Sequence, residues 1–225
     1  MIPEARWIGR AAIRASLFVA ILALLLCGCS TPADKLIARA NDPDPVVRLR
    51  AVWSLGGLDP RQENVLQALI NALADEDKHV KIAACRQLGA IGPQAATAVP
   101  HLLLCLRNED PLIRRYTAWA LGNMGHAARP AVPELAGLLV DREGKVRGEA
   151  AQALGRLGPY SLPALRPLIE LAICDEDPAR LVAINALGSI GPEARAAAPA
   201  LKTLRRHWDP EVRDAAFKAL SQIIP

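Results

Sequence analysis

Hydrophobic and small residues recur every 33 residues along most of the chain. A Leu-Gly pair marks the period at Leu55-Gly56, Leu88-Gly89, Leu121-Gly122, Leu154-Gly155 and Leu187-Gly188, with Leu220-Ser221 in the last copy. A second leucine column keeps the same spacing at Leu36, Leu69, Leu102, Leu135, Leu168 and Leu201. Self-similarity at a fixed period is the signature of a repeat architecture, so this pattern predicts a solenoid.

Each repeat predicts two helices joined by a short turn. In the third copy the apolar positions Ile113, Thr117, Ala120, Leu121 and Met124 follow the i, i+4, i+7, i+8 spacing of an amphipathic helix. Gly-Pro then follows in most copies. We expect the glycine to end the helix in a left-handed conformation and the proline to prevent a restart. The second helix begins near Ala-Val-Pro, where proline in the first turn costs no hydrogen bond.

In this register the chain contains a half repeat from residue 31 to about 41, five full 33-residue repeats and a closing helix. Alanine and leucine dominate, and aromatic residues make up only 4% of the chain, which favours helices over strands. The predicted fold class is therefore all-α, a right-handed α-solenoid of about twelve helices.

Two charged columns share the 33-residue period. The acidic column is predicted to cap the first helices, and together with the basic column four residues later it is predicted to form ladders between repeats. The acidic column contains Asp44, Asp77, Asp110, Glu143, Glu176 and Asp209, and the basic column contains Arg48, Lys81, Arg114, Arg147, Arg180 and Arg213.

The N-terminus is predicted to be a targeting segment that lies outside the repeats. Residues 1–14 contain three arginines and one glutamate, and residues 15–26 are uncharged and apolar. A run of this length is short for the roughly 20 residues of a membrane-spanning helix, which favours a removable signal sequence. Without residues 1–28 the formal net charge falls from +4 to about +2, so the remaining chain lacks the single-sign field of a nucleic-acid-binding protein.

The end of the apolar run, Leu26-Cys27-Gly28-Cys29-Ser30, resembles the lipobox of bacterial lipoproteins. The resemblance implies that residues 1–28 are a lipoprotein signal peptide, that Cys29 carries the lipid and that residues 29–33 form a short linker before the solenoid of residues 34–225. Cys27 departs from the pattern. The alternatives are ordinary secretory cleavage or an uncleaved anchor over residues 11–29. Ser30 after the cysteine implies a lipid anchor in the outer membrane of the bacterial cell envelope, facing the periplasm.

The repeats resemble the HEAT-like repeats first recognised in phycobilisome lyase subunits, with the consensus Asp-x-x-Val-Arg-x-x-Ala-x-x-Ala-Leu-Gly. Residues 44–56, 110–122 and 209–220 match it closely, and the resemblance covers roughly residues 31–225. Ankyrin repeats share the period, but their Thr-Pro-Leu-His turn is absent. The resemblance leaves two functions open: a scaffold or adaptor for a protein partner, or a subunit of a bilin-lyase-like enzyme. Export argues against the lyase, whose substrates would be cytosolic.

Binding candidates come from positions that packing does not require. The column two residues before each leucine points away from the apolar set and reads Trp53, Arg86, Trp119, Gln152, Asn185 and Lys218. Tyr116 lies one turn before Trp119. Aromatic and arginine side chains are enriched in binding hot spots, so Trp53, Arg86, Tyr116 and Trp119 are the candidate partner-binding residues. The alternative interpretation is that the rings cover the junctions between repeats.

No pattern indicates catalysis, a cofactor or a metal site. The four histidines lie in different repeats without a second ligand at metal-binding spacing. The acidic run Asp175-Glu176-Asp177 falls before a helix, where acids favour the dipole. Cys85 and Cys105 are expected to be buried thiols, with a disulfide between them as the alternative. The chain is therefore predicted to be a non-catalytic, membrane-tethered scaffold.

Overall fold

The computed structural model describes residues 31–174 and 178–224, and these residues form helices and turns without strands. The chain divides into two compact units, Met1–Lys35 and Leu36–Pro225. The predicted signal peptide, Cys29, Glu176 and the rest of the acidic run 175–177 lie outside the described residues. Five described residues of the first unit, Thr31 to Lys35, begin a helix whose start is capped by hydrogen bonds between Thr31 and Asp34.

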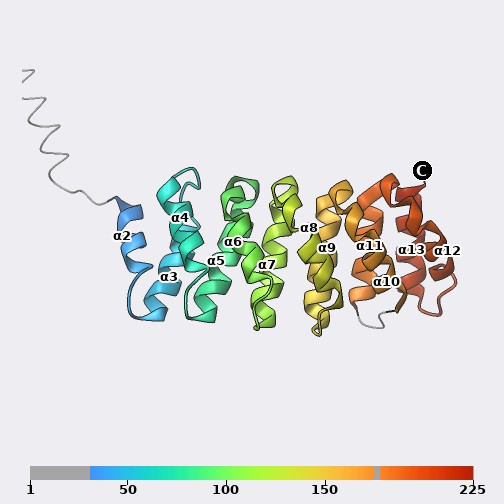
Figure 1. Ribbon diagram of the computed structural model, residues 1–225, viewed down its shortest axis with the longest axis horizontal. Helices are drawn as coiled ribbons and strands as arrows, with labels where there is room; N and C mark the ends of the chain where they lie inside the picture. The colour runs from blue at the N-terminus through green and yellow to red at the C-terminus, as the bar shows by residue number, and fades with distance from the viewer. Residues whose placement is uncertain (1–30, 175–177, 225) are drawn as a thin grey trace, which may run out of the picture. The chain divides into compact units, whose positions relative to one another are not determined.

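The described residues contain twelve α-helices in the predicted order, which confirms the all-α solenoid (Figure 1). The half repeat is α2 (Pro32–Arg39) and the closing helix is α13 (Pro210–Ile223). The first helices of the five full repeats are α3 (Pro45–Leu55), α5 (Lys78–Ile91), α7 (Pro111–Asn123), α9 (Gly144–Leu157) and α11 (Ala179–Ile190). The second helices are α4 (Glu63–Ala72), α6 (Val99–Cys105), α8 (Val132–Gly137), α10 (Leu165–Cys174) and α12 (Ala198–Leu204).

The first helices of successive repeats pack directly on one another within the second unit. Contacts run from α3 to α5, α7, α9, α11 and α13 in chain order, and each second helix packs on the first helix of the following repeat. The predicted apolar set of α7 is fully covered, since Ile113, Thr117, Leu121 and Met124 are all buried. Residues Lys78–Cys105 have the length and hydropathy of a membrane span, but they form α5, a 3₁₀ turn and α6 within this packed array.

The Leu-Gly glycines permit close approach between neighbouring first helices. A Cβ added to Gly122 on α7 would lie 2.8 Å from Ala153 Cα on α9, and one added to Gly155 would lie 3.0 Å from Ala186 Cα on α11. Both distances are shorter than ordinary carbon–carbon contacts of about 3.5–4.0 Å. The glycine of the motif therefore serves helix packing.

The glycines that end the first helices differ from the expected left-handed geometry. Gly92 has φ 70° and ψ −136°, and Gly158 has φ 57° and ψ −130°. These pairs lie outside the left-handed helical region, where ψ is positive, in a region that is essentially restricted to glycine. A 3₁₀ helix begins at once, for example at Gly92–Ala98, so the proline starts a new turn.

Candidate functional site

Two inter-repeat ion pairs form what we call the arginine ladder. Arg48 places Nε 2.8 Å from Asp75 Oδ2 and Nη2 2.8 Å from Asp75 Oδ1. Arg114 bonds Asp141 through the same two nitrogens at 2.7 and 2.8 Å. All four side chains are less than a tenth exposed. Paired hydrogen bonds of this kind fix geometry as well as charge, so they define the angle between neighbouring repeats.

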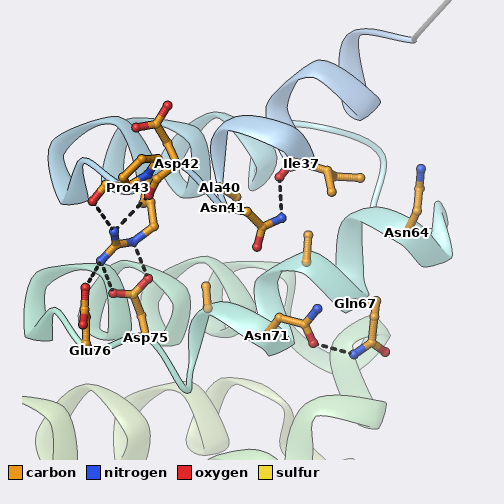
Figure 2. A pocket seen from close by; sticks show the side chains of 13 residues that line it. Ile37, Ala40, Asn41, Asp42, Pro43, Asn64, Gln67, Asn71, Asp75 and Glu76 are labelled. Atoms are coloured by element: carbon orange, nitrogen blue, oxygen red, sulfur yellow. Dashed lines mark hydrogen bonds and ion pairs between the residues drawn. The ribbon is translucent and has the colours of Figure 1, made fainter.

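The remaining nitrogen of each ladder arginine holds the loop before its own helix. Arg48 Nη1 donates to the carbonyl oxygens of Asp42 and Pro43 at 3.0 and 2.9 Å (Figure 2). Arg114 donates in the same way to its own loop at 2.8 Å. Equivalent bonds join Arg147 to Asp141 and Arg142 and join Arg213 to His207 and Trp208. Arg48 and Arg114 therefore anchor both the loop before their own helix and the junction with the next repeat.

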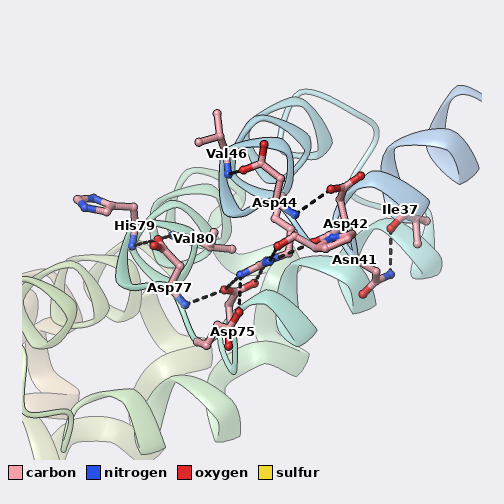
Figure 3. Close-up of polar contacts among 12 residues, drawn as sticks. Ile37, Asn41, Asp42, Asp44, Val46, Asp75, Asp77, His79 and Val80 are labelled. Carbon is pink, nitrogen blue, oxygen red and sulfur yellow. Dashed lines mark hydrogen bonds and ion pairs between the residues drawn. The ribbon is translucent and has the colours of Figure 1, made fainter.

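The acids of the predicted column cap helices. Asp44 accepts the backbone N–H of Val46, and Asp77 accepts those of His79 and Val80 (Figure 3). Asp110 and Asp209 cap α7 and α13 through single bonds of 2.8 Å. The side chain of Glu143 makes no such bond at the start of α9.

The acid that pairs with each ladder arginine belongs to a column that the sequence reasoning missed. Asp75 and Asp141 lie two residues before the caps, in a register that reads Asp42, Asp75, Asn108, Asp141, Cys174 and His207. Five of these side chains also accept the N–H of the residue two positions later: Asp42, Asp75, Asn108, Asp141 and His207. The 33-residue spacing of these polar side chains is the signal in the sequence that could have identified the column.

The other basic residues of the column meet different partners. Arg180 Nη1 lies 2.9 Å from His207 Nε2, and its Nη2 donates to the Ile173 carbonyl oxygen at 3.2 Å. The charge of Lys81 helps to lower the pKa of Asp75, and the position 27 residues after Lys81, where Arg48 and Arg114 have their aspartates, is the uncharged Asn108. The junctions along the solenoid are therefore chemically unequal.

The two ladder aspartates are held in the charged form. Burial raises the pKa of Asp75, but the hydrogen bonds from Arg48 and from the Asp77 N–H and the nearby positive charges outweigh it, so the pKa is lowered. The pKa of Asp141 is lowered by the same balance of burial against Arg114 and the Glu143 N–H. Both carboxylates therefore stabilise the fold in their ionised state.

Three of the four candidate binding residues form one stack. The guanidinium carbon of Arg86 on α5 lies 4.9 Å from the ring centre of Trp53 on α3 and 5.5 Å from that of Tyr116 on α7. Arg115 approaches the same tyrosine at 5.4 Å and pairs with Glu149 at 3.5 Å. Such cation–π contacts are worth about 0.5–1 kcal/mol at exposed sites. We call Trp53, Arg86 and Tyr116 the aromatic–arginine stack.

Trp119, the fourth candidate binding residue, is not part of the aromatic–arginine stack. A Cβ on Gly89 would lie 2.5 and 2.8 Å from two carbons of the Trp119 ring, so the ring packs over that glycine at the α5–α7 junction. Trp119 is partly buried, whereas Trp53 is 42% exposed. The indole of Trp119 covers a junction, and that of Trp53 faces solvent and Arg86.

A polar hollow opens between the half repeat and α4, with a volume of about 740 Å³ (Figure 2). Ala40 and Ala72 line it, and residues 33 and 66 positions after them are mostly leucine, as at Leu73, Leu106 and Leu138. The carboxamides Asn41, Asn64, Gln67 and Asn71 also line it. All four amides are engaged, since Asn41 donates to the Ile37 carbonyl, Gln67 donates to Asn71, and Asn64 accepts the Val65 N–H.

The described residues were also considered as sites for a reactive thiol or a metal ion. Cys85 and Cys105 are free and buried, and Cys85 lies 3.4 Å from Thr117 Oγ1. The contact with Cys105 and burial raise the pKa of the Cys85 thiol, so it stays protonated. Across residues 31–174 and 178–224, no three His, Cys, Asp or Glu side chains are grouped to hold a metal ion.

Repeated helix pairs stacked through first-helix contacts define an α-solenoid repeat protein. The sequence profile described as HEAT repeats matches residues 33–103 and 99–178, so the chain belongs to the HEAT repeat family. HEAT-type solenoids act as scaffolds for protein interaction. The specific likeness to phycobilisome lyase repeats stays a prediction. No curated protein matches the chain in sequence.

Solved structures share the fold at low sequence identity. An engineered protein matches with a TM-score of 0.66 and 23% identity over 86% of this chain and 96% of its own. A computationally designed armadillo repeat protein for modular peptide recognition has a TM-score of 0.60 and 19% identity, over 84% and 98%. The archaeal HEAT-like repeat protein from Thermococcus onnurineus NA1 has a TM-score of 0.58 and 18% identity, over 84% and 85%.

Proposed function

We propose that the chain is a non-catalytic scaffold that binds a protein partner through the face of α3, α5 and α7. The observation that carries the proposal is the aromatic–arginine stack, in which side chains from three successive repeats meet at the surface. Packing does not require Trp53 and Arg86, since their column holds Gln152, Asn185 and Lys218 in later repeats, and the column of Tyr116 continues with Glu149, Val182 and Ala215. Aromatic and arginine residues are the types that dominate interface free energies.

A peptide or protein ligand suits the geometry of the face. The designed armadillo relative is described as built for modular peptide recognition, and its repeats stack in a similar fold. Adjacent packed helices lie about 8–10 Å apart, so a ligand crossing α3, α5 and α7 would extend over about 20 Å. An extended segment of about six residues covers that distance.

The scaffold is proposed to be tethered by lipid at Cys29 to the bacterial outer membrane, on its periplasmic side. The support is the sequence Leu26-Cys27-Gly28-Cys29 after a basic and apolar leader. The described solenoid begins at Pro32 in α2, three residues after the proposed lipid. A lipid anchor would therefore hold the repeats close to the membrane surface.

A pull-down from gently solubilised membranes tests both parts of the proposal. The wild-type chain is compared with Cys29→Ser, and the mass of the N-terminal peptide is measured. A diacylated Cys29 and a defined partner would support the tethered scaffold, and an unmodified cysteine would refute the tether.

The binding face is tested in the same experiment with Trp53→Ala and Arg86→Ala. Both variants should lose the partner while their helical circular dichroism stays unchanged. Glu170→Ala, which removes an exposed charge from α10, is the matched control and should keep the partner. Retention of the partner by both Trp53→Ala and Arg86→Ala would refute the binding face.

A further inference from the structure

The guanidinium of Arg86 lies over two aromatic rings, and among the described residues its N–H groups are unused. Its central carbon lies 4.9 Å from the ring centre of Trp53 and 5.5 Å from that of Tyr116, on the two neighbouring helices. Within the part of the chain that the structure describes, no hydrogen bond or ion pair engages the N–H groups of Arg86. Because arginine has five donors in a planar fork, the edge of this side chain is free to bind a ligand.

The helices around Arg86 offer it no carboxylate. All charged side chains within α3, α5 and α7 are basic: Arg48, Arg50, Lys78, Lys81, Arg86, Arg114 and Arg115. Glu149 on α9 is paired with Arg115. The nearest acid on the same chain segment, Asp77, caps the start of α5 nine residues before Arg86, which is about 14 Å along a helix.

The ladder shows what an arginine of this chain does when a carboxylate is within reach. Arg48 and Arg114 each bind both oxygens of an aspartate through Nε and Nη2. Arg86 presents the same two nitrogens without an internal partner. Its contacts with the two rings restrict the side chain before a ligand arrives, which reduces the entropy that binding would otherwise cost.

We propose that Arg86 is a preorganised receptor for the carboxylate of an aspartate or glutamate in an extended segment of the protein partner. A neighbouring apolar side chain of that segment packs on the exposed indole of Trp53. This assignment rests on the proposed function and deepens it by naming the chemistry of the partner. Arg48, Lys78, Arg114 and Arg115 already have acidic partners within the chain, so the positive charge that complements an acidic segment comes from Arg86 and from Arg50 on α3. The rest of the solenoid supplies no continuous positive field for nucleic acid.

The test is fluorescence polarisation with the full-length, detergent-solubilised chain and a labelled, end-blocked decapeptide of alternating Glu and Phe. A peptide with Gln in place of every Glu is the uncharged control. The wild-type chain should bind the Glu peptide at least about tenfold more tightly than the Gln peptide, which corresponds to about 1.4 kcal/mol.

Three variants distinguish recognition by the planar pair of N–H donors from attraction by positive charge alone. Arg86→Ala and Arg86→Lys should both abolish the preference for Glu, because lysine keeps the charge but lacks the planar pair of donors. Arg205→Ala should keep the preference, since it removes an arginine stacked on Phe217 at 5.3 Å, on another part of the solenoid. Unchanged melting temperatures would show that all three variants fold.

Several outcomes would overturn the carboxylate assignment: no binding of the Glu peptide, equal binding of the two peptides, full preference in Arg86→Lys, or tighter binding of a ten-residue thymidine oligonucleotide. If peptide binding is independent of Glu but lost in Trp53→Ala, the assignment fails and the proposed binding face stands. If the partner captured from membranes is also insensitive to Trp53→Ala and Arg86→Ala, both proposals fail.

Discussion

Substitution of Gly122 by alanine tests whether the Leu-Gly motif serves helix packing. The new Cβ would lie 2.8 Å from Ala153 Cα and 3.0 Å from Ala153 Cβ, so α7 and α9 would have to separate. Overpacking of this kind costs about 1–3 kcal/mol. Alanine regains at most about 1 kcal/mol of helix propensity. If the full propensity gain is realised, we therefore expect a net loss of up to about 2 kcal/mol.

Gly148→Ala is the matched control, because Gly148 lies inside α9 with its nearest neighbours at 3.9 and 4.0 Å. At Gly148 no steric clash opposes the gain in helix propensity, so the free energy of unfolding should rise by up to about 1 kcal/mol. For a domain of this size 1 kcal/mol shifts the melting temperature by about 2–4 °C. Thermal unfolding followed by circular dichroism at 222 nm should thus place Gly122→Ala below wild type and Gly148→Ala at or above it. The packing argument is refuted if Gly122→Ala melts as high as Gly148→Ala.

Three further predictions concern the ladder, the two tryptophan rings and the buried thiol. Asp141→Asn should cost about 1–2 kcal/mol near pH 7, because the buried guanidinium of Arg114 loses its charged partner. Since the folded pKa of Asp141 is lowered, its contribution to the free energy of unfolding is fully present above the unfolded pKa of about 3.9. That contribution disappears as the pH falls through the folded pKa. A difference in melting temperature between Asp141→Asn and wild type that stays constant from pH 5 to 2 would contradict this. Trp119→Ala should cost about 1–3 kcal/mol and Trp53→Ala less than about 1 in urea unfolding, and equal losses would show that both rings are structural. Cys85 should resist iodoacetamide in the folded chain and react in 8 M urea, as read by peptide mass spectrometry, whereas rapid labelling of native protein would contradict its burial.

The solenoid and its helix count follow from the sequence because 33-residue periodicity forces every repeat into one structure. Asp44 and Asp110 could be recognised as caps, since capping depends only on residues within one turn. The ladder could not be assigned from the columns, because Arg48 reaches across to Asp75 in another repeat and the pairing depends on the angle between repeats. Several acids share a similar spacing, and sequence alone does not select among them.

The candidate site, like the ladder, depends on contacts between helices that the sequence pattern does not reveal. Trp53, Arg86 and Trp119 share one column and are indistinguishable by spacing. Side-chain direction separates them, since the indole of Trp119 turns onto Gly89 and Arg86 inserts between Trp53 and Tyr116. That choice depends on neighbouring helices, and in particular on the space that Gly89 leaves open.

The unequal junctions bear on how the solenoid bends. Arg48–Asp75 and Arg114–Asp141 clamp their junctions with buried ion pairs, whereas the α5–α7 junction between them is joined by the more exposed pair of Lys78 and Asp110, 3.7 Å apart. Curvature in a solenoid is the sum of small angles at its junctions. We expect the α5–α7 junction to bend more readily than the two junctions that a buried ion pair clamps. It also separates Arg86 from Tyr116, so a ligand bound to the aromatic–arginine stack would stiffen this junction and change the curvature of the solenoid.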